Sequence, residues 1–494
     1  MYEDRIKLPQ LREKLMGADE AAAFVKAGMT LGFSGFTAVG YPKLIPGAIA
    51  ARGEAGNLTV LAGASAGDEL DGALARAGLV AYRSPFNVSK DLRSGINSGK
   101  IGYTDQHLGQ LPGMVWSGNF GKIDIAIIEC CGILENGEII PTLSVGASNT
   151  FVQCADKVLL ELNLSHPLDI CGIHDIYTVG KRPCLRPIPV CSAGDRAGSV
   201  GIPCPPEKIV GIVVSEVPDQ QPRFAPPGPV SDSIAAHIIE LLRSEIKAGR
   251  LPADFTMQSG FGAVANAVLY ALDSDEFGKL NMYTEVVQDG ALELILKGRI
   301  AKASATSLSL SFEGRRRFYE NLPLLKDRFV LRPQDVSNSA EVISRLGVVA
   351  MNTAVEVDIY GNVNSTHIMG SSMMNGIGGS GDFARNGLLS IFMTPSVAKD
   401  GKISAIVPMV SHTDHTEHDV DIIVTEYGLA DLRGKTPAQR AGIIIENCSH
   451  PDYRPLLREY LEKAKGKANA LHTPHDLEKA LSWHRRYLDT GSMK

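Results

Sequence analysis

The sequence has few aromatic residues and no excess of positive charge. Aromatic side chains make up 6% of the 494 residues, and 49 Lys and Arg are outnumbered by 55 Asp and Glu, which gives a formal net charge of −6. Proteins that bind nucleic acid usually combine a basic surface with aromatic side chains on which bases stack. The composition therefore excludes a typical nucleic-acid-binding protein.

Long apolar runs and closely spaced cysteine pairs are also missing. No uncharged apolar run approaches the roughly 18 residues that indicate a membrane-spanning helix. The first residues, Met1–Arg5, carry acidic side chains and no apolar signal core, so we expect a cytoplasmic protein. Seven of the eight cysteines lie between Cys130 and Cys204, but none forms a C-x-x-C pair. We therefore expect reduced, buried cysteines and no metal.

Short apolar runs alternate with amphipathic stretches along most of the chain. Continuous apolar runs are typical of parallel strands buried on both faces, and their alternation with helices predicts βαβ units. The fold class is therefore α/β. The expected strands are Met29–Phe33, Leu58–Leu61, Ile123–Ile128, Val158–Leu162, Ile209–Val214, Met282–Val287, Val348–Met351, Ile403–Val407 and Asp421–Thr425.

A proline-rich segment suggests where the chain divides. Residues 217–230 contain five prolines, which indicates a linker or an ordered loop. We expect an N-terminal domain over residues 1–225 and a C-terminal domain over residues 226–494, with a helix over Ser231–Lys247 near the start of the second. Hairpins are expected at Asn136-Gly137 and Gly361-Asn362. The C-terminal quarter should be helical, with helices after Thr436, Pro451 and Pro474.

Two glycine-rich loops could hold an anion or an oxyanion through backbone N–H groups. Met374–Phe383 contains the pattern G-x-G-x-x-G. A poor strand precedes it, so NAD binding is disfavoured, and a catalytic turn or a structural loop remains open. Met257–Asn266 leads from a strand into a helix expected over Ala263–Leu272, where N–H groups at the helix start could face an anion.

Two acidic residues lie at or near the ends of apolar strands. Glu285 is in the second half of the strand expected over Met282–Val287, and Glu426 follows Asp421–Thr425. Carboxylates at strand ends line the ligand crevice of open α/β sheets, so the two acids could be a nucleophile and its helper. Solvated loop acids or helix caps remain the alternative. The nearby tract with His412, His415 and His418 could bind metal or could be a solvated or substrate-facing loop.

Together these segments resemble the acetyl-CoA hydrolase/transferase family of class I CoA-transferases, above all the bacterial succinyl-CoA:acetate CoA-transferases. The matching blocks run in order along essentially the whole chain. They include Ser34-Gly35-Phe36-Thr37, Tyr41-Pro42-Lys43, Gly63-Ala64-Ser65, Arg83-Ser84-Pro85-Phe86-Asn87, His107-Leu108-Gly109-Gln110, Gln258-Ser259-Gly260, Thr284–Gly290, Asp335–Asn338, Ile359–Thr366, Met373–Arg385, Leu429–Gly434 and Leu481–His484.

The resemblance implies two similar open α/β domains with the active site between them and a helical C-terminal segment. It implies that Glu285 attacks an acyl-CoA and then carries CoA as a γ-glutamyl thioester, in a ping-pong exchange with a second carboxylic acid. The substrates would be acyl-CoA and short carboxylic acids. No cofactor beyond coenzyme A as substrate is implied, and a homodimer is expected.

The resemblance also assigns roles to individual residues. It places oxyanion donors at the backbone N–H groups of Phe261 and Gly379, where relatives commonly have Val at the first position. Asn338 and Glu426 would orient the nucleophile. Relatives that use succinate often carry an Arg at the position of Gln220. The implied CoA contacts are Met257, Gln258, Ser259, Gly260, Phe261, Asn375, Gly379 and Lys399, and the implied contacts to the substrate carboxylate are Ser65 and the nearby Arg223.

Three other functions remain open at this stage. An acetyl-CoA hydrolase would need the same residues, because only the exclusion of water separates hydrolysis from transfer. A propionyl-CoA:succinate CoA-transferase would differ in its acid pocket alone. A non-catalytic CoA-binding regulator is disfavoured, because a pure binding protein needs no nucleophile at Glu285.

Overall fold

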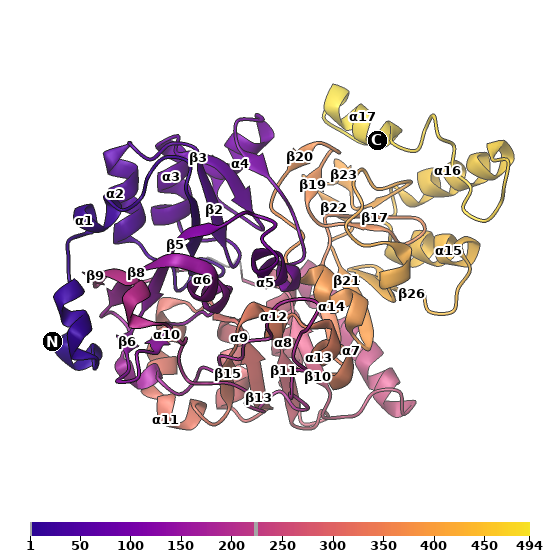
Figure 1. Ribbon diagram of the computed structural model, residues 1–494. Helices are drawn as coiled ribbons and strands as arrows, with labels where there is room; N and C mark the ends of the chain where they lie inside the picture. Colours follow the sequence, from indigo (N-terminus) through magenta and orange to yellow (C-terminus); the bar gives the residue numbers. More distant parts are fainter. Residues whose placement is uncertain (1, 222–225) are drawn as a thin grey trace. The chain divides into compact units, whose positions relative to one another are not determined.

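The computed structural model describes residues 2–221 and 226–494, which form two compact units (Figure 1). The first unit contains Met1–Arg223 and Asn281–Leu346, and the second contains Phe224–Leu280 and Gly347–Lys494. The predicted domains, 1–225 and 226–494, differ from these units in the segment Asn281–Leu346, which groups with the N-terminal residues. The predicted boundary itself falls at the edge of the residues that are not described.

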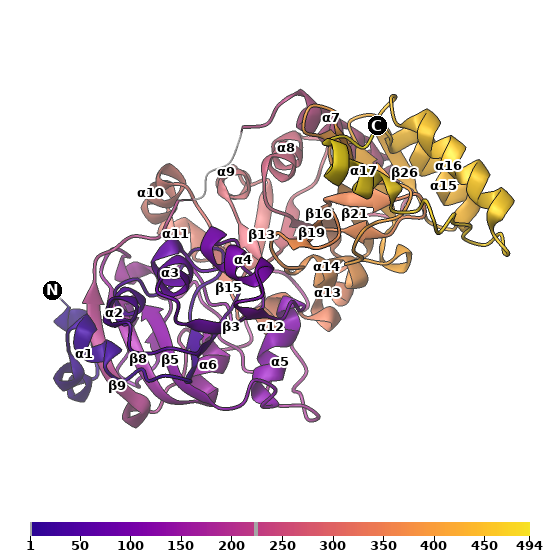
Figure 2. The same cartoon turned by 90° about the horizontal axis from the view of Figure 1, so that it is seen from above.

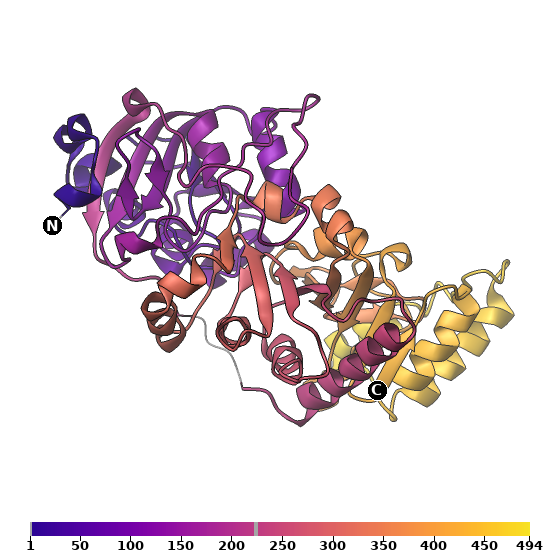
Figure 3. The same cartoon turned by 90° about the horizontal axis from the view of Figure 1, so that it is seen from below.

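A parallel sheet of seven strands forms the centre of the first unit, and its neighbouring purple strands are visible in Figure 3. Every neighbouring pair in it is parallel. The five strands predicted before residue 215 are confirmed. In spatial order the strands are β4 (Gly102–Tyr103), β3 (Val80–Ser84), β2 (Leu58–Ala62), β1 (Thr30–Phe33), β5 (Ile123–Cys130), β8 (Ala155–Asn163) and β9 (Ile209–Ser215).

Helices pack on this sheet through the apolar residues of its strands. Leu31 and Phe33 of β1 share one buried cluster with residues of the first four helices, and each such side chain contributes roughly 1.5–3 kcal/mol by burial. On the other face Phe151 lies so close to Gly32 that a Cβ there would meet its ring at 2.6 Å. The helices are α1 (Ala18–Ala22), α2 (Leu44–Arg52), α3 (Ala73–Arg76), α4 (Lys90–Asn97), α5 (Leu111–Trp116) and α6 (Ser148–Cys154).

The segment Asn281–Leu346 adds further strands and helices to the first unit. The single strand predicted over Met282–Val287 is wrong in one respect, because it is broken at Thr284 and Glu285 into β11 (Leu280–Tyr283) and β12 (Val286–Val287). After the break, β12 pairs with β14 (Ser307–Leu308) in a separate small sheet. The other elements are α9 (Asp289–Leu296), β13 (Ile300–Ala305), α10 (Phe312–Glu320), α11 (Leu322–Leu325), β15 (Phe329–Leu331), α12 (Gln334–Ser337) and α13 (Ala340–Leu346).

The second unit repeats the parallel architecture with an antiparallel edge strand. Strands β10, β16, β21 and β25 run parallel, and β26 closes the sheet in the opposite direction. The helix predicted over Ser231–Lys247 is confirmed as α7, which begins at Pro229. The elements are α7 (Pro229–Lys247), β10 (Thr256–Ser259), α8 (Ala263–Ala271), β16 (Val349–Thr353), α14 (Ser380–Asn386), β21 (Leu389–Met393), β25 (Ile422–Thr425) and β26 (Gly428–Asp431).

Both predicted hairpins are confirmed. Asn136-Gly137 joins β6 (Gly132–Ile133) to β7 (Ile139–Ile140), and Gly361-Asn362 joins β17 (Glu356–Asp358) to β18 (Val363–Asn364). The second hairpin extends with β24 (Ile406–Val407) into a three-stranded sheet. The remaining short strands are β19 (His367–Ile368), β20 (Ser372–Met373), β22 (Val397–Ala398) and β23 (Ile403–Ser404), so the strand predicted over Ile403–Val407 is divided between β23 and β24.

The predicted helical C-terminal segment is confirmed. It contains α15 (Pro437–Cys448), α16 (Arg454–Lys467) and α17 (Ser482–Thr490), and Figure 2 shows α15 and α16 side by side in yellow. Thr436 caps α15 through its side chain, which accepts a hydrogen bond from the backbone N–H of Gln439, as expected for a capping box. In the described part of the chain, no helix is long and apolar enough to cross a membrane.

A buried ion pair fixes the segment that follows β2. The guanidinium of Arg83 is fully buried and contacts both carboxylate oxygens of Asp71, at 3.0 and 3.2 Å. It also donates to the carbonyl oxygen of Ala64 at 2.7 Å, and the backbone N–H of Ala66 donates to Asp71 at 2.8 Å. The pair therefore holds the loop on both sides of Ser65.

We predict that Arg83→Met destabilises the protein by about 3–5 kcal/mol, because it leaves the buried carboxylate of Asp71 without its partner. The matched control is Arg76→Met, since Arg76 binds Asp68 and Asp91 at an exposed position. Exposed ion pairs contribute little, so this variant should unfold at nearly the wild-type temperature. Thermal unfolding of both variants tests the prediction, and equal melting temperatures would show that the buried pair is dispensable.

Candidate active site

Glu285 lies at the break between two strands of the first unit. The backbone N–H of Thr284 donates to the carbonyl oxygen of Ser304 at 2.9 Å. The carbonyl oxygen of Glu285 accepts from the N–H groups of Thr306 at 2.9 Å and Ser307 at 3.0 Å. The half-buried Glu285 side chain is thereby turned out of the strand from a fixed backbone, as expected for a reactive carboxylate at the carboxyl end of a parallel strand.

Asn338 contacts the carboxylate of Glu285 directly. Its Nδ2 donates to Oε1 of Glu285 at 2.7 Å, while Oδ1 of Asn338 accepts from the Ser337 hydroxyl at 3.0 Å. The hydroxyl of Tyr283 donates to the carbonyl oxygen of Val336 at 2.5 Å, which ties α12 to the strand that precedes Glu285. The predicted pairing of Asn338 with Glu285 is therefore present in the structure.

The helix that ends directly before this asparagine carries Asp335, an acid with an unusual pKa. Burial raises the pKa of Asp335 to about 7, because an ionised carboxylate loses its hydration when it is buried. A substantial fraction of Asp335 is therefore uncharged at neutral pH.

Ser65 lies in a turn that is linked to Glu285 through Ser307. The carbonyl oxygen of Ser65 accepts from the N–H of Ala38 at 3.1 Å, and the Ser307 hydroxyl donates to the carbonyl oxygen of Phe36 at 3.0 Å. Thr37, between them, has a positive φ of 54°, which is rare for a β-branched residue and costs backbone energy. Phe36 also shares one apolar cluster with Val286, so Ser65 and Glu285 belong to the same part of this unit.

Residues 63–67, Gly-Ala-Ser-Ala-Gly, have the form G-x-S-x-G, which also occurs at the nucleophile elbow of serine hydrolases. Here the turn follows β2 and precedes a short helical turn at Asp68–Gly72. A serine nucleophile needs a base such as histidine within hydrogen-bond reach. Within residues 2–221 and 226–494, no histidine makes a hydrogen bond with Ser65, whose side chain is buried, so the structure offers no serine triad at this position.

The second unit contains the first glycine-rich turn, between β10 and α8. The N–H of Gly260 donates to the carbonyl oxygen of Met351 at 2.8 Å, and a Cβ at Gly260 would lie 3.1 Å from that oxygen. Gly262 has a φ of 120° and caps α8, a conformation that favours glycine. Phe261, between the two glycines, is 47% exposed, and the predicted role of its backbone N–H as an oxyanion donor stays a prediction.

The residues that precede this turn face inward. Met257 is fully buried, and Gln258 bonds through its side chain to the N–H of Met351 at 2.9 Å and to Asn352 at 3.2 Å. The Ser259 hydroxyl lies 3.4 Å from the carbonyl oxygen of Gly260. These side chains support the turn, and their predicted contacts with CoA stay predictions.

The second glycine-rich turn leads into α14 of the same unit. Gly378 has a φ of 63°, and Gly379 is the residue before the helix. Ser380 fixes the turn, because its hydroxyl donates to the carbonyl oxygen of Ile377 at 2.7 Å and lies 3.0 Å from Nε2 of the buried His415. Asn375 precedes the turn and is partly buried. The motif therefore forms a defined backbone turn, which agrees equally with a catalytic turn and with a structural loop.

Glu426 holds a loop of the second unit through Ser396. Its carboxylate accepts from the Ser396 N–H at 2.8 Å and from the Ser396 hydroxyl at 2.5 Å. Lys399, farther along this loop, is exposed and has a positive φ of 51°. Ser396 is a residue that the sequence analysis missed, because a lone serine after a proline carries no local signal of this contact.

The three histidines of the predicted tract have different surroundings. His412 stacks on His367 with ring centres 3.8 Å apart, His415 lies under Phe392 at 4.7 Å, and the exposed His418 contacts the hydroxyl of Thr416 at 3.2 Å. Among the described residues these histidines do not gather at one place. The structure therefore favours the loop interpretation over a shared metal site.

The predicted contact to a second substrate carboxylate is at the edge of the described residues. Arg223 lies outside them. Gln220, which takes the place of the family's arginine, donates to the carboxylate of Glu69 at 2.9 Å, and the hydroxyl of Tyr41 donates to the same oxygen at 2.5 Å. The role of Arg223 in binding succinate stays a prediction.

Comparison with known proteins defines the class to which this geometry belongs. The model of the acetyl-CoA hydrolase/transferase N-terminal domain matches residues 2–214, and that of the C-terminal domain matches residues 314–461. The chain is a member of the acetyl-CoA hydrolase/transferase family, and it is an enzyme of that family. The resemblance inferred from the sequence is therefore confirmed.

Individual relatives are similar over nearly their whole length. A succinyl-CoA:acetate CoA-transferase of Clostridium kluyveri is 48% identical, and the alignment covers 100% of this chain and 92% of the relative. A propanoyl-CoA:succinate CoA transferase of Escherichia coli is 42% identical, and the alignment covers 97% of this chain and 98% of the relative. An acetyl-CoA hydrolase of Candida albicans is 43% identical, with 100% and 98% covered.

Solved structures confirm the fold. RipA from Yersinia pestis matches with a TM-score of 0.72 at 24% identity, over 92% of this chain and 98% of the other. A 4-hydroxybutyrate CoA-transferase from Porphyromonas gingivalis matches with a TM-score of 0.65 at 23% identity, over 92% and 99%. The predicted α/β class with CoA-transferase architecture is therefore confirmed.

We predict that Asn338→Ala lowers kcat on acetyl-CoA by about 10- to 100-fold and changes KM little. Hydrogen bonds to charged groups contribute about 1.5–3 kcal/mol. The hydrogen bond lost in Asn338→Ala is the one that orients the reacting carboxylate of Glu285. Asn321→Ala is the control, since its Nδ2 donates only to the carbonyl oxygen of Arg317 at 2.8 Å. Steady-state kinetics separates the two effects, and an unchanged kcat in Asn338→Ala would remove Asn338 from the site.

Proposed function

We propose that the protein is a CoA-transferase that moves CoA between succinyl-CoA and acetate through a γ-glutamyl-CoA thioester on Glu285. The observation that carries the proposal is the carboxylate of Glu285, held by Asn338 at a strand break. It occurs in a chain that is 48% identical to a succinyl-CoA:acetate CoA-transferase. Cytoplasmic location, a homodimer and the absence of a cofactor other than CoA belong to the same proposal.

The reaction needs a carboxylate because its intermediate must stay reactive. Glu285 attacks the thioester carbonyl of succinyl-CoA, and the CoA thiolate leaves, which gives a mixed succinyl–glutamyl anhydride. The thiolate then attacks the glutamyl carbonyl of the anhydride and expels succinate, which leaves CoA bound to Glu285 as a thioester. Acetate attacks this thioester, and the reverse sequence of steps forms acetyl-CoA and frees Glu285.

Each attack creates an oxyanion that needs hydrogen-bond donors. The proposal assigns these donors to the backbone N–H groups of Phe261 and Gly379, which lie in the two glycine-rich turns. Backbone donors in fixed turns need no reorganisation as charge develops, and one such donor typically contributes about 10²–10³-fold in rate. Ser65 is assigned to the carboxylate of the acid substrate.

Hydrolysis of acetyl-CoA is the second candidate function. It is favoured by the 43% identity to a Candida albicans acetyl-CoA hydrolase over the whole chain. The same glutamyl intermediate would serve both reactions, and the outcome depends on whether water or a carboxylic acid reaches it first.

We predict that Glu285→Ala lowers turnover by about 10⁴-fold or more, because removal of a nucleophile eliminates the covalent route. The affinity for CoA should change little, since binding does not require the carboxylate. Glu293→Ala is the control, because Glu293 is a surface acid of the same unit that pairs with Arg317. Rates and CoA affinities of both variants test the assignment, and ordinary turnover in Glu285→Ala would refute the mechanism.

We predict parallel double-reciprocal lines when acetate is varied at several concentrations of succinyl-CoA, because succinate must leave before acetate enters. In the reverse direction, succinate should accelerate the consumption of acetyl-CoA and should appear as succinyl-CoA. Consumption of acetyl-CoA at one rate with and without succinate would identify a hydrolase. Intersecting lines would indicate direct transfer in a ternary complex.

A further inference from the structure

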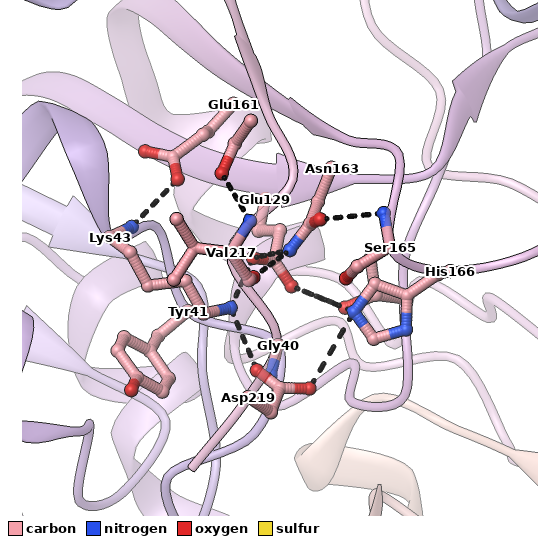
Figure 4. Close-up of polar contacts among 12 residues, drawn as sticks. Gly40, Tyr41, Lys43, Glu129, Glu161, Asn163, Ser165, His166, Val217 and Asp219 are labelled. Carbon is pink, nitrogen blue, oxygen red and sulfur yellow. Dashed lines mark hydrogen bonds and ion pairs between the residues drawn. The ribbon is translucent and has the colours of Figure 1, made fainter. Parts of the chain in front are cut away.

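A buried polar cluster of the first unit contains none of the residues assigned to catalysis (Figure 4). Glu129 is near the carboxyl end of β5, His166 follows β8, and Asp219 follows β9. These three strands are neighbours in a parallel sheet, so their carboxyl ends meet at one edge. All three side chains are at least 96% buried.

Lys43 occupies only one side of the two carboxylates. Its ammonium group donates to Oε2 of Glu129 and, at 2.7 Å, to Oδ1 of Asp219. Further donors surround the same two oxygens: the side chain of Asn163 at 2.9 Å from Oε2, and the N–H of Gly40 at 3.0 Å from Oδ1. Oε2 of Glu129 and Oδ1 of Asp219 are therefore satisfied by protein donors, and Oε1 of Glu129 also accepts from the hydroxyl of Thr142 at 2.8 Å.

The other oxygens face a histidine across a short gap. Nε2 of His166 lies 3.7 Å from Oε1 of Glu129 and 3.7 Å from Oδ2 of Asp219, which is too long for a hydrogen bond. Among the described residues, neither this Nε2 nor Oδ2 of Asp219 has a hydrogen-bond partner. Two buried polar atoms without partners, aimed at one point beside a third oxygen, are costly unless something binds there.

The orientation of the histidine suits a ligand. Nδ1 of His166 lies 2.8 Å from the hydroxyl of Tyr319, a second contact of the kind that orients metal-binding imidazoles. The positive groups near Asp219 contact other atoms: Lys43 binds Oδ1, and Arg315 donates to the backbone carbonyl oxygen at 3.2 Å.

We propose that Oε1 of Glu129, Nε2 of His166 and Oδ2 of Asp219 bind one divalent cation of the Zn²⁺ or Mn²⁺ class. The three atoms lie within 4.8 Å of one another. Ligand atoms about 2.1 Å from a common ion lie roughly 3.4–3.6 Å apart. The two distances of 3.7 Å from Nε2 need to shorten only slightly, whereas the two carboxylates, whose ligand atoms lie within 4.8 Å of each other, must approach by up to about 1.3 Å. One imidazole with two carboxylates suits Zn²⁺ or Mn²⁺ better than Mg²⁺ or Ca²⁺, which prefer oxygen ligands.

The cation has a structural role. It cross-links the ends of β5, β8 and β9, and it fixes Asp219 shortly before the chain continues to α7. Lys43 and Asn163 donate to carboxylate oxygens that do not face the cation, and these contacts keep the two carboxylates in place. The sequence predicts no metal here, because the three ligands come from distant segments and have no local spacing.

The test uses the full-length protein, stripped with EDTA and dialysed against Zn²⁺ or Mn²⁺ at fixed free concentration. Bound metal is counted by mass spectrometry of the elements, and thermal unfolding is recorded with and without metal. The variants are His166→Gln and Asp219→Asn, which keep much of the side-chain volume. His174→Gln is the control, because His174 is an equally buried histidine whose Nε2 contacts the carbonyl oxygen of Thr142 at 2.9 Å.

We expect one bound ion per chain in the wild type and in His174→Gln, with a melting temperature that rises by a few degrees on loading. The two ligand variants should lose affinity by about 100-fold or more and show no rise. Cobalt(II) loading should give a visible absorption band only in proteins that keep His166 and Asp219. Substoichiometric metal in the wild type, equal binding by all variants, or a crystal structure with a water and no anomalous signal at this point would overturn the proposal.

Discussion

The arrangement of the site depends on the interruption of a strand at Glu285. Two N–H groups, of Thr306 and Ser307, bind the carbonyl oxygen of Glu285, at the break between β11 and the pairing of β12 with β14. The side chain then leaves the sheet and meets the amide of Asn338 at 2.7 Å. A continuous strand would place the carboxylate on a face of the sheet, where helices cover it. The local break therefore creates the position from which a carboxylate can act.

Buried charge organises the first unit around this position. Arg83 and Asp71 hold the loop that contains Ser65, and Lys43 with Glu129 and Asp219 holds the strand ends of β5 and β9. Burial raises the pKa of Glu129 to about 8, whereas for Asp219 the nearby Lys43 more than offsets burial, and the pKa lies below its usual value. A charged group is costly to bury without a partner, so the position of each loop depends on the ion pair that holds it. In the second unit, loops are held in place by backbone turns and by the contact of Glu426 with Ser396.

Much of the fold could be predicted from the sequence, because continuous apolar runs and turn residues are local signals. The strands before residue 215, helix α7, both hairpins and the α15 cap followed from such patterns. The break at Glu285 could not be predicted, since it depends on N–H groups of residues 306 and 307. The association of Asn281–Leu346 with the N-terminal residues is likewise a tertiary effect. Of the site, Glu285 and Asn338 were predicted as a pair through the family resemblance, but Ser396 and the cluster around His166 depend on contacts between distant segments.

The central claim is that Glu285 forms a covalent bond with CoA. The most direct measurement is peptide mass spectrometry after the protein is incubated with succinyl-CoA in the absence of an acceptor acid. The account predicts a CoA adduct on the peptide that carries Glu285. The adduct should be released by hydroxylamine and by acetate, and borohydride should reduce it with loss of activity. Turnover without any adduct on Glu285, or an acyl group found instead on Ser65, would contradict the account.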